Sequence, residues 1–393
     1  MKSKIYIFIT TSGIALLFLL ISINQTHKYR SSSNGLNSQI SKGELLKSEN
    51  IQVKEKKAGT LYRKLQDGST LNRILREGGF LEQVNSWNGK LLFVTFNSVK
   101  PSPEFRYYSH NSSYEDTNRN GVQDKSDKGF FNPASTVKVS VAALSLEKLN
   151  KIGLTRESEY RMTESSNWFR IDEDIRRSLV ISDNDATNRL ILWLGFDYIN
   201  HTLESKGLTH LVIDRLMLNQ GTLIESPPFE IRLRNKRISQ PSKSVSIKAT
   251  CYETASQVGI CATASDLVGV LLRIVQPDYL LAEEKFNLKQ DDRQWLQEVM
   301  SHTPRKEYFD YPDNYCRFLT QVERKIAGKS GRMLSKCGVA LFSNTYVDSS
   351  FIETDSGQKY YVVFSVTPPQ GISEQEIIKW MNTITNFALL KLP

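Results

Sequence analysis

The chain has 393 residues, of which 39% are hydrophobic and 24% are charged, with 21 glycines and 12 prolines. This composition is typical of a globular protein and excludes collagen-like and low-complexity classes. Four cysteines and five histidines are too few for a disulfide scaffold or a histidine-rich metal protein. The net charge of +9 is compatible with nucleic acid, an acidic surface or no charged partner, so its position along the chain decides what it means.

The first segment, residues 1–24, is predicted to be a signal anchor or a signal peptide. Lys2 and Lys4 precede an uncharged apolar stretch over residues 5–23. At 1.5 Å per residue this stretch is just long enough for a hydrocarbon core of about 30 Å. No Ala-x-Ala cleavage site and no lipoprotein cysteine directly follow it. We therefore favour an uncleaved anchor over a removed signal peptide, and either over a buried core helix.

Residues 25–60 are predicted to be a polar tether. Residues 1–60 hold nine lysines or arginines and three glutamates, so +6 of the net charge lies here and +3 remains for residues 61–393. Such a basic tail suits anionic lipid. Because the charge excess lies in the tail and no aromatic-basic motif occurs, we expect no nucleic-acid partner. The predicted location is the cell envelope, with the protein exported and membrane-anchored, periplasmic or secreted.

Export would place the cysteines where disulfides can persist. Cys251, Cys261, Cys316 and Cys337 allow three pairings, of which Cys251 with Cys261 is the most local, and free buried thiols are the alternative. No two of them have the C-x₂₋₄-C spacing, so a zinc site is set aside.

The folded part, residues 61–393, is predicted to run from strands to helices and back to strands. Pro133 marks the start of the first long helix and Gly153 its end. The expected elements are strands 91–96 and 105–109, a polar loop 110–130, helices 133–153, 172–181, 185–194 and 265–272, strands 339–342 and 360–366, and helix 373–390. This order predicts an α+β fold, in which an antiparallel sheet forms from both chain ends (61–132 and 265–393) with flanking helices, and residues 133–264 form an all-helical lobe.

The loop contains one candidate metal site, because residues 116–127 match the ligand spacing of an EF-hand calcium loop. The expected ligands are Asp116, Asn118, Asn120, the backbone of Val122, Asp124 and Asp127, with Gly121 at the sixth position. The twelfth position is aspartate instead of the usual glutamate, and the flanking segments do not predict a helix pair. A polar surface loop is the alternative, and any calcium would be structural.

Three short motifs bring together the groups that acyl transfer needs. Ser135 and Lys138 stand one turn apart near a helix start, where a lysine of lowered pKa can accept the serine proton. Residues 182–184 read Ser-Asp-Asn between two helices, where a hydroxyl can relay a proton and an amide can hold a carbonyl. Residues 328–331 read Gly-Lys-Ser-Gly before the last strands, where an ammonium and a hydroxyl can bind a carboxylate.

Each motif alone has an ordinary explanation as a helix start, a capped turn or a hairpin turn. Together and in this order they form the set given for class A β-lactamases and penicillin-binding proteins. Over roughly residues 80–393 the chain resembles this family of serine hydrolases. The sequence from Thr263 to Leu267 and that from Asp292 to Leu296 resemble two further helices of the family. The spacing between the second and third motifs indicates insertions near residues 220–255 and 303–322.

The resemblance implies a role for each matching residue. Ser135 would attack an amide carbonyl and become acylated, with Lys138 as its base and Ser182 passing the proton to the leaving nitrogen. The other implied site residues are Asn184 for the acyl side chain, Lys329 and Ser330 for the substrate carboxylate, Gly331 for close approach of the ligand, and the backbone N–H groups of Ser135 and Arg332 for the oxyanion hole. No cofactor is required for this chemistry, and none of the five histidines lies in a motif, which argues against a Ser-His-Asp triad.

One departure from the family concerns the water that releases the acyl group. Family β-lactamases place a glutamate in an Arg-x-Glu-x-x-Leu-Asn pattern, and the nearest match here, residues 214–219, has Met217 at the glutamate position. A thioether cannot act as a base. Glu225 and Glu230 follow in a different local pattern. Either another carboxylate reaches the site, or the acyl-enzyme is long-lived.

We therefore expect a monomeric envelope hydrolase that forms an acyl-enzyme with a β-lactam or a related cyclic or peptidic amide. Its substrate would be a small molecule or derive from peptidoglycan. The alternatives are a D-alanyl-D-alanine peptidase resembling penicillin-binding proteins, another envelope amidase or esterase with slow β-lactam turnover, and a non-catalytic peptidoglycan-binding module. The last is disfavoured because a retired site would be expected to lose one of its motif residues.

Overall fold

The computed structural model of the chain describes residues 68–97, 104–112, 129–218, 225–245, 259–303, 308–312, 315–328 and 331–393. The predicted anchor and tether, residues 1–60, and the predicted calcium loop, residues 116–127, lie outside the described residues. Within the described ranges, no helix has both the length and the apolar character needed to cross a membrane.

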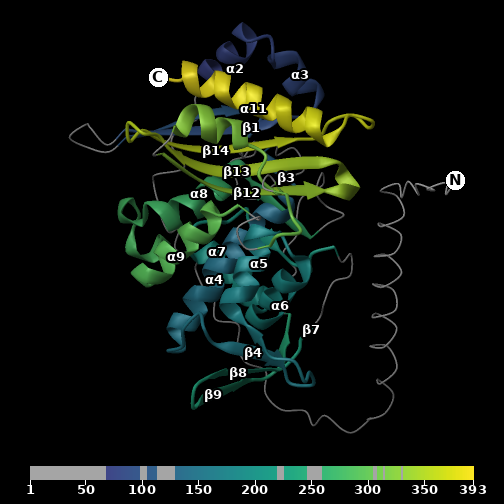
Figure 1. The fold of residues 1–393 in the computed structure, drawn as a ribbon, viewed down its shortest axis with the longest axis vertical. Coiled ribbons are helices and arrows are strands. Elements are labelled where there is room, and N and C mark those ends of the chain that lie inside the picture. The colour runs from purple at the N-terminus through teal and green to yellow at the C-terminus, as the bar shows by residue number, and fades with distance from the viewer. Residues whose placement is uncertain are drawn as a thin grey trace, which may run out of the picture. The chain divides into compact units, whose positions relative to one another are not determined.

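A five-stranded antiparallel sheet with the order β12-β13-β14-β1-β2 forms the centre of the larger lobe (Figure 1). Its strands are β1 (Lys90–Asn97), β2 (Glu104–His110), β12 (Arg332–Ala340), β13 (Thr345–Glu353) and β14 (Lys359–Val366). β1 pairs with β2 as a hairpin and with β14 on its other side, so that Lys90 lies opposite Ser365. The predicted antiparallel sheet built from both chain ends is therefore confirmed.

Helices cover both faces of this sheet, which explains why its central strands β1 and β14 are apolar over most of their length. Figure 1 shows α2 (Gly68–Glu77), α3 (Leu81–Ser86) and α11 (Glu374–Lys391) on one face. There Trp380 of α11 packs on Phe364, with ring centroids 5.6 Å apart. On the other face lie α8 (Ala264–Val275) and α9 (Gln290–Ser301). α8 begins at a capping box in which Thr263 and Asp266 satisfy each other's backbone N–H groups, and it contains the helix predicted over residues 265–272.

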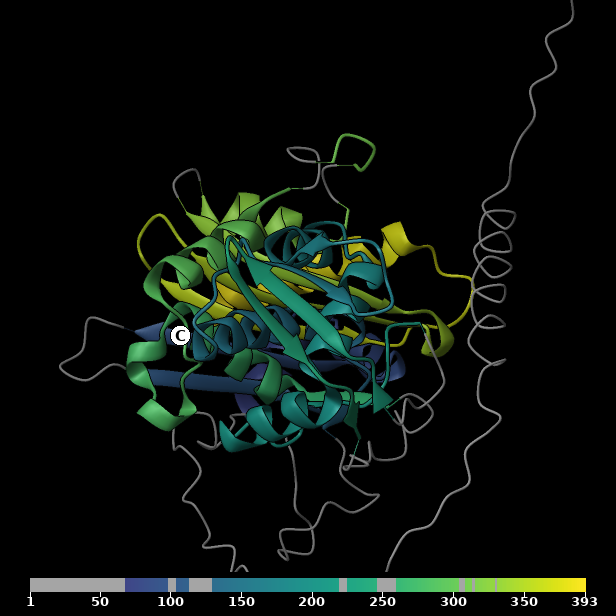
Figure 2. The same cartoon turned by 90° about the horizontal axis from the view of Figure 1, so that it is seen from below.

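The second lobe contains the predicted helices together with strands that the sequence did not predict. Its helices are η1 (Ala134–Val137), α4 (Lys138–Lys151), α5 (Ile171–Val180), α6 (Asn184–Leu194) and α7 (Phe196–Ser205). A four-stranded sheet, β5-β4-β8-β9, is made of β4 (Glu159–Met162), β5 (Phe169–Arg170), β8 (Phe229–Leu233) and β9 (Lys236–Gln240). Figure 2 shows the β8–β9 hairpin from below. Strands this short give no periodic signal, so the expectation of an all-helical lobe is corrected.

The remaining described elements are short. They are β3 (Phe130–Phe131), β6 (Val212–Ile213), β7 (Glu225–Ser226), β10 (Lys243–Ser244), β11 (Ile260–Thr263), η2 (Pro277–Tyr279), η3 (Ala282–Glu284), α10 (Thr320–Val322), η5 (Glu323–Ala327) and η6 (Leu341–Ser343). The strand expected over residues 339–342 is confirmed for residues 339 and 340, which end β12, and corrected for residues 341 and 342, which lie in η6. Leu341 and Phe342, whose apolar character favoured a strand, are 75% and 74% exposed in the turn after β12.

Candidate active site

The turn before α4 holds Ser135 at the start of a buried helix. Ala134 adopts a left-handed φ of 49°, its N–H donates to Asn132 Oδ1 at 3.0 Å, and the Thr136 hydroxyl donates to Pro133 O at 2.6 Å. These bonds fix the turn in a conformation that costs an L-residue roughly 1–2 kcal/mol. Strain of this kind is concentrated at functional sites in proteins.

Lys138 follows one turn later and connects the first two motifs. Its side chain is fully buried, and Nζ donates to Ser182 O at 2.6 Å, to Ser182 Oγ at 3.2 Å and to Asn184 Oδ1 at 2.7 Å. Burial lowers the pKa of Lys138 well below its ordinary value, and the positive charge of Lys336 lowers it further. Lys138 therefore joins Ser182 and Asn184 to the helix start that carries Ser135, and burial makes this lysine easier to deprotonate than a lysine in water.

The Ser-Asp-Asn loop is held by its middle residue. Asp183 caps α6 by accepting hydrogen bonds from Asp185 N and Ala186 N at 2.8 and 3.0 Å, and it pairs with Arg177 at 2.5 Å. Burial by itself would raise the pKa of Asp183, but the bonds from Ala186 and Arg177 outweigh it and lower the pKa. Ser182 has a φ of 57°, which is uncommon for a residue with a side chain.

The strand β12 forms the opposite wall of the site through Gly338. A Cβ placed on Gly338 would collide with Ser135 N and lie 2.8 Å from the Cβ of Ala134, so only glycine lets the strand approach the turn this closely. Lys336, two residues earlier, is 1% exposed and carries a pKa lowered by burial to about 7. Residues 336–338 thus read Lys-Cys-Gly, a second Lys-x-Gly motif that sequence reasoning missed. In the sequence, this motif could have been recognised only from the spacing of its lysine and glycine, because cysteine replaces the serine or threonine of the family motif.

Of the motif predicted for this wall, the structure describes Gly328 and Gly331. Lys329 and Ser330 are outside the described residues. Gly331 packs against the carbonyls of Ala327 and Glu353, and Arg332 pairs with Glu353 at the start of β12. Arg332 is six residues from Gly338, which is about 20 Å along a strand. The structure therefore does not bring Gly331 or Arg332 to Ser135, and the expectation that Arg332 N joins the oxyanion hole is corrected.

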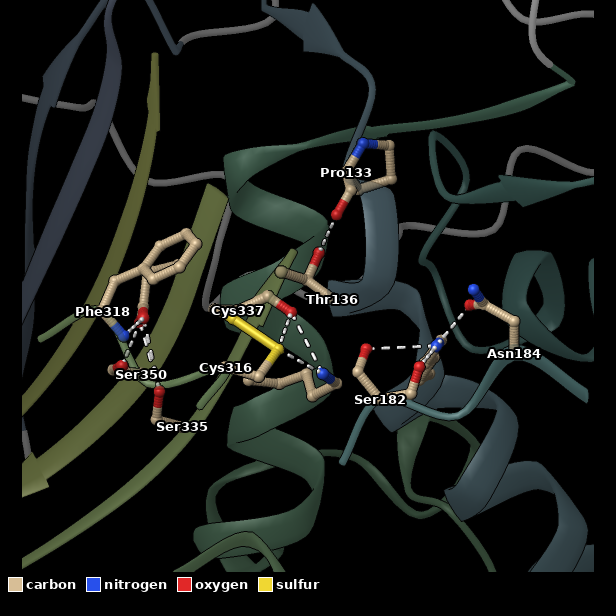
Figure 3. The surroundings of a disulfide bond; sticks show 12 residues. Pro133, Thr136, Ser182, Asn184, Cys316, Phe318, Ser335, Cys337 and Ser350 are labelled. Atoms are coloured by element: carbon tan, nitrogen blue, oxygen red, sulfur yellow. Dashed lines mark hydrogen bonds between the residues drawn. A yellow bond between two sulfur atoms is a disulfide. The ribbon is translucent and has the colours of Figure 1, made fainter. Parts of the chain in front are cut away.

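A disulfide joins Cys316 to Cys337 beside these residues (Figure 3). In Figure 3 it lies between Ser182 and Asn184 on one side and Phe318, Ser335 and Ser350 on the other. Cys261 is also disulfide-bonded, with its partner outside the described residues. The alternative of free buried thiols is thus wrong for these three cysteines, and the pairing of Cys251 with Cys261 stays a prediction.

Met217, the residue that the sequence pattern aligns with the missing glutamate, is buried. Met217 is 7% exposed, and Asn188 of α6 holds its backbone, accepting from Met217 N at 2.7 Å and donating to Met217 O at 3.3 Å. Glu230 lies on β8, where it pairs with Arg161 and Arg237 at 2.6 and 2.7 Å. Glu225 begins the short strand β7 and is exposed.

In the described ranges, no group of three metal-binding side chains occurs.

Comparison with solved structures defines the class to which this fold belongs. The chromosome-encoded β-lactamase of Vibrio parahaemolyticus is 13% identical, with a TM-score of 0.52 over 81% of this chain and 98% of that chain. A variant of PBP-A in an acyl-enzyme complex with penicillin G is 16% identical, with a TM-score of 0.52 over 84% of this chain and all of that chain. At these identities the likeness shows the fold, which is that of β-lactamases and penicillin-binding proteins.

The sequence places the chain within this class. The model of the β-lactamase enzyme family matches residues 105–390. No curated protein matches the chain. The chain therefore belongs to the β-lactamase enzyme family, as its motifs predict, and family and fold together support a serine hydrolase of the β-lactamase and penicillin-binding protein type.

Proposed function

We propose that the chain is an exported serine hydrolase that forms an acyl-enzyme at Ser135 with a β-lactam or a related amide. The observation that carries the proposal is the position of Lys138. It lies one turn after Ser135, is fully buried, and has its amine within 3.2 Å of the Ser182 hydroxyl and 2.7 Å of the Asn184 amide. Burial lowers the pKa of this lysine, so it loses a proton more readily than an exposed lysine and can then serve as the base for a neighbouring serine.

The reaction divides into two steps. In the first, Ser135 Oγ bonds to the carbonyl carbon while Lys138 takes its proton. The carbon–nitrogen bond then breaks, and Ser182 passes the proton from Lys138 to the leaving nitrogen. The backbone N–H of Ser135 and that of Val339, which follows Gly338, are the proposed donors to the developing oxyanion, and losing one such donor costs about 10²–10³ in rate in a related reaction. In the second step, water attacks the ester, releases the acid and regenerates Ser135.

The second step is proposed to be slow, because Met217 stands where a carboxylate would activate the water. This favours a long-lived acyl-enzyme, like that expected of a D-alanyl-D-alanine peptidase or of another envelope amidase or esterase. Neither step requires a cofactor. The same proposal includes a location in the cell envelope and an anchor formed by residues 1–24. It also includes a monomeric state and a substrate that is a small molecule or derives from peptidoglycan.

Intact-protein mass spectrometry after incubation with penicillin G tests the proposal. The expected result is the addition of one penicillin per chain, its loss in Ser135→Ala, and its retention in Ser205→Ala, which removes an exposed hydroxyl on α7 that donates to Thr202 O of the same helix. An adduct that survives Ser135→Ala, or none on the unmodified protein, would contradict Ser135 as nucleophile. An adduct that decays within seconds would contradict the slow second step.

A further inference from the structure

We propose that the acyl donor that Ser135 takes carries no carboxylate beside the bond that is broken, because the Cys316–Cys337 disulfide occupies the place next to the Lys336 ammonium where that carboxylate would be held. The natural substrates would then be neutral esters and amides, which narrows the proposed function by removing D-alanyl-D-alanine peptides and leaves β-lactams as reactive probes of Ser135. This inference names the substrate of the site proposed above and rests on Ser135 as the nucleophile.

A site that holds an anion beside a nucleophile needs a cation with open N–H donors, and it gains from a neighbouring hydroxyl that can donate as well. Here Lys336 provides the cation, and Gly338, two residues on, borders the turn that holds Ser135. The residue between them is Cys337, whose sulfur is bonded to Cys316. The side chain at position 337 therefore offers an incoming carboxylate no hydrogen to accept.

The ammonium of Lys336 is itself already surrounded. Nζ lies 2.9 Å from Cys316 Sγ and 3.2 Å from Cys337 O, and the side chain is 1% exposed. A disulfide sulfur has no proton to donate and accepts only weakly. Burial also lowers the pKa of Lys336 to about 7, so that around neutral pH its positive charge is only partly present. A carboxylate would have to lose its hydration and displace the disulfide to reach a weakened cation.

The disulfide is also fixed at both of its ends. Cys337 is 2% exposed within β12, where it lies opposite Asp348 of β13. On the other side of the bridge, Phe318 N donates to Asp348 Oδ2 at 3.3 Å, which ties the chain after Cys316 to the same strand. The sulfur atoms beside Lys336 therefore belong to the rigid wall of the site and cannot be displaced by a change of rotamer.

Penicillin G and its methyl ester differ only in the carboxylate, so the ratio of their acylation rates on Ser135 measures what that group contributes. A carboxylate bound by a charged donor normally gains about tenfold or more. We expect the rates for the acid and the ester on the full chain, measured by intact-protein mass spectrometry with Ser135→Ala as the blank, to agree within about threefold. An acid that reacts at least tenfold faster than its ester would overturn the inference.

A matched pair of variants isolates the hydroxyl. Both remove the disulfide, one as Cys316→Ala/Cys337→Thr and the other as Cys316→Ala/Cys337→Val, so that they differ only in one hydroxyl against one methyl group. We expect the threonine variant to favour the acid by about tenfold over the valine variant, with equal melting temperatures as the control for folding. Equal ratios in two folded variants would contradict the role given to position 337.

The outcomes separate this inference from the function on which it rests. If neither penicillin adds to Ser135, the proposed function fails and the inference falls with it. If both add and the acid is strongly preferred, Ser135 stands as the nucleophile and only the assignment of a carboxylate-free substrate is wrong.

Discussion

The pKa of Lys138 sets the pH range in which Ser135 can react. It is lowered first by burial and second by the charge of Lys336. Because only the neutral amine accepts a proton, acylation should rise with pH as Lys138 deprotonates. Lys336→Met removes one cause of the lowered pKa, so this rise should move to higher pH. The measurement is the rate of acylation by penicillin across a range of pH, with Lys359→Met on β14 as the control. A pH profile that does not move in Lys336→Met would exclude coupling between Lys138 and Lys336.

Lys148 makes a separate prediction about stability. It is buried under the end of α6, where Nζ donates to Trp193 O at 2.6 Å, and burial and Lys243 lower its pKa from 10.5 to about 6. Between these values the unfolded chain binds a proton that the folded chain lacks, so this group makes the free energy of unfolding rise with pH, by up to about 1.4 kcal/mol per pH unit.

Lys148→Met should remove that slope. The measurement is urea unfolding of the variant and the unmodified protein at several pH values between 6.5 and 9, a window of roughly two and a half units inside the range where one proton separates the two states. Lys151→Met removes a more exposed lysine from the same helix and serves as the control. Parallel stability curves for Lys148→Met and the unmodified protein would mean that Lys148 stays charged in the folded state.

At the scale of elements, α6 depends on the cap that also positions the Ser-Asp-Asn loop. Asp183→Ala removes the acceptor for two backbone N–H groups and leaves Arg177 without its carboxylate partner. We expect a loss of about 1–2 kcal/mol in the free energy of unfolding, together with slower acylation because Ser182 and Asn184 lose their support. Asp185→Ala, an exposed change in the same first turn, should cost far less in urea unfolding. Equal losses in the two variants would contradict the capping role.

The elements that sequence reasoning identified are those with local signals. Helix α11 has a capping box at Ser373, and α6 ends at Gly195, whose φ is 82°. β13 was missed because its centre is polar. Asp348 is fully buried there and is satisfied by Ser335, Ser350 and the backbone N–H of Phe318, which is a tertiary network that no local pattern reveals.

The same limit applies to the candidate site, whose residues could be named from the sequence only where a local motif marks them. Ser135, Lys138, Ser182 and Asn184 could be proposed from the sequence because each belongs to a short motif on one segment. Residues 336–338 were missed for two reasons. A disulfide partner 21 residues away explains the cysteine in the middle of the motif, and the better local match at residues 329–331 lies just before the same strand.

For the whole molecule, the sheet is complete only when both ends of the folded part are present, since β1 pairs with β14 across most of the chain. α11 closes this arrangement by covering the sheet with a face that includes Ile377, Met381, Ile384 and Leu389, all buried. Burying four such side chains contributes roughly 6–12 kcal/mol, as much as the total stability of a typical domain.

Removing residues 373–393 should therefore prevent folding, whereas removing only 392–393, which follow the helix, should not. Soluble yield and the near-ultraviolet circular dichroism of the two truncated chains provide the measurement. A soluble protein with native dichroism after loss of the helix would mean that the first strands and α2 suffice to hold the sheet.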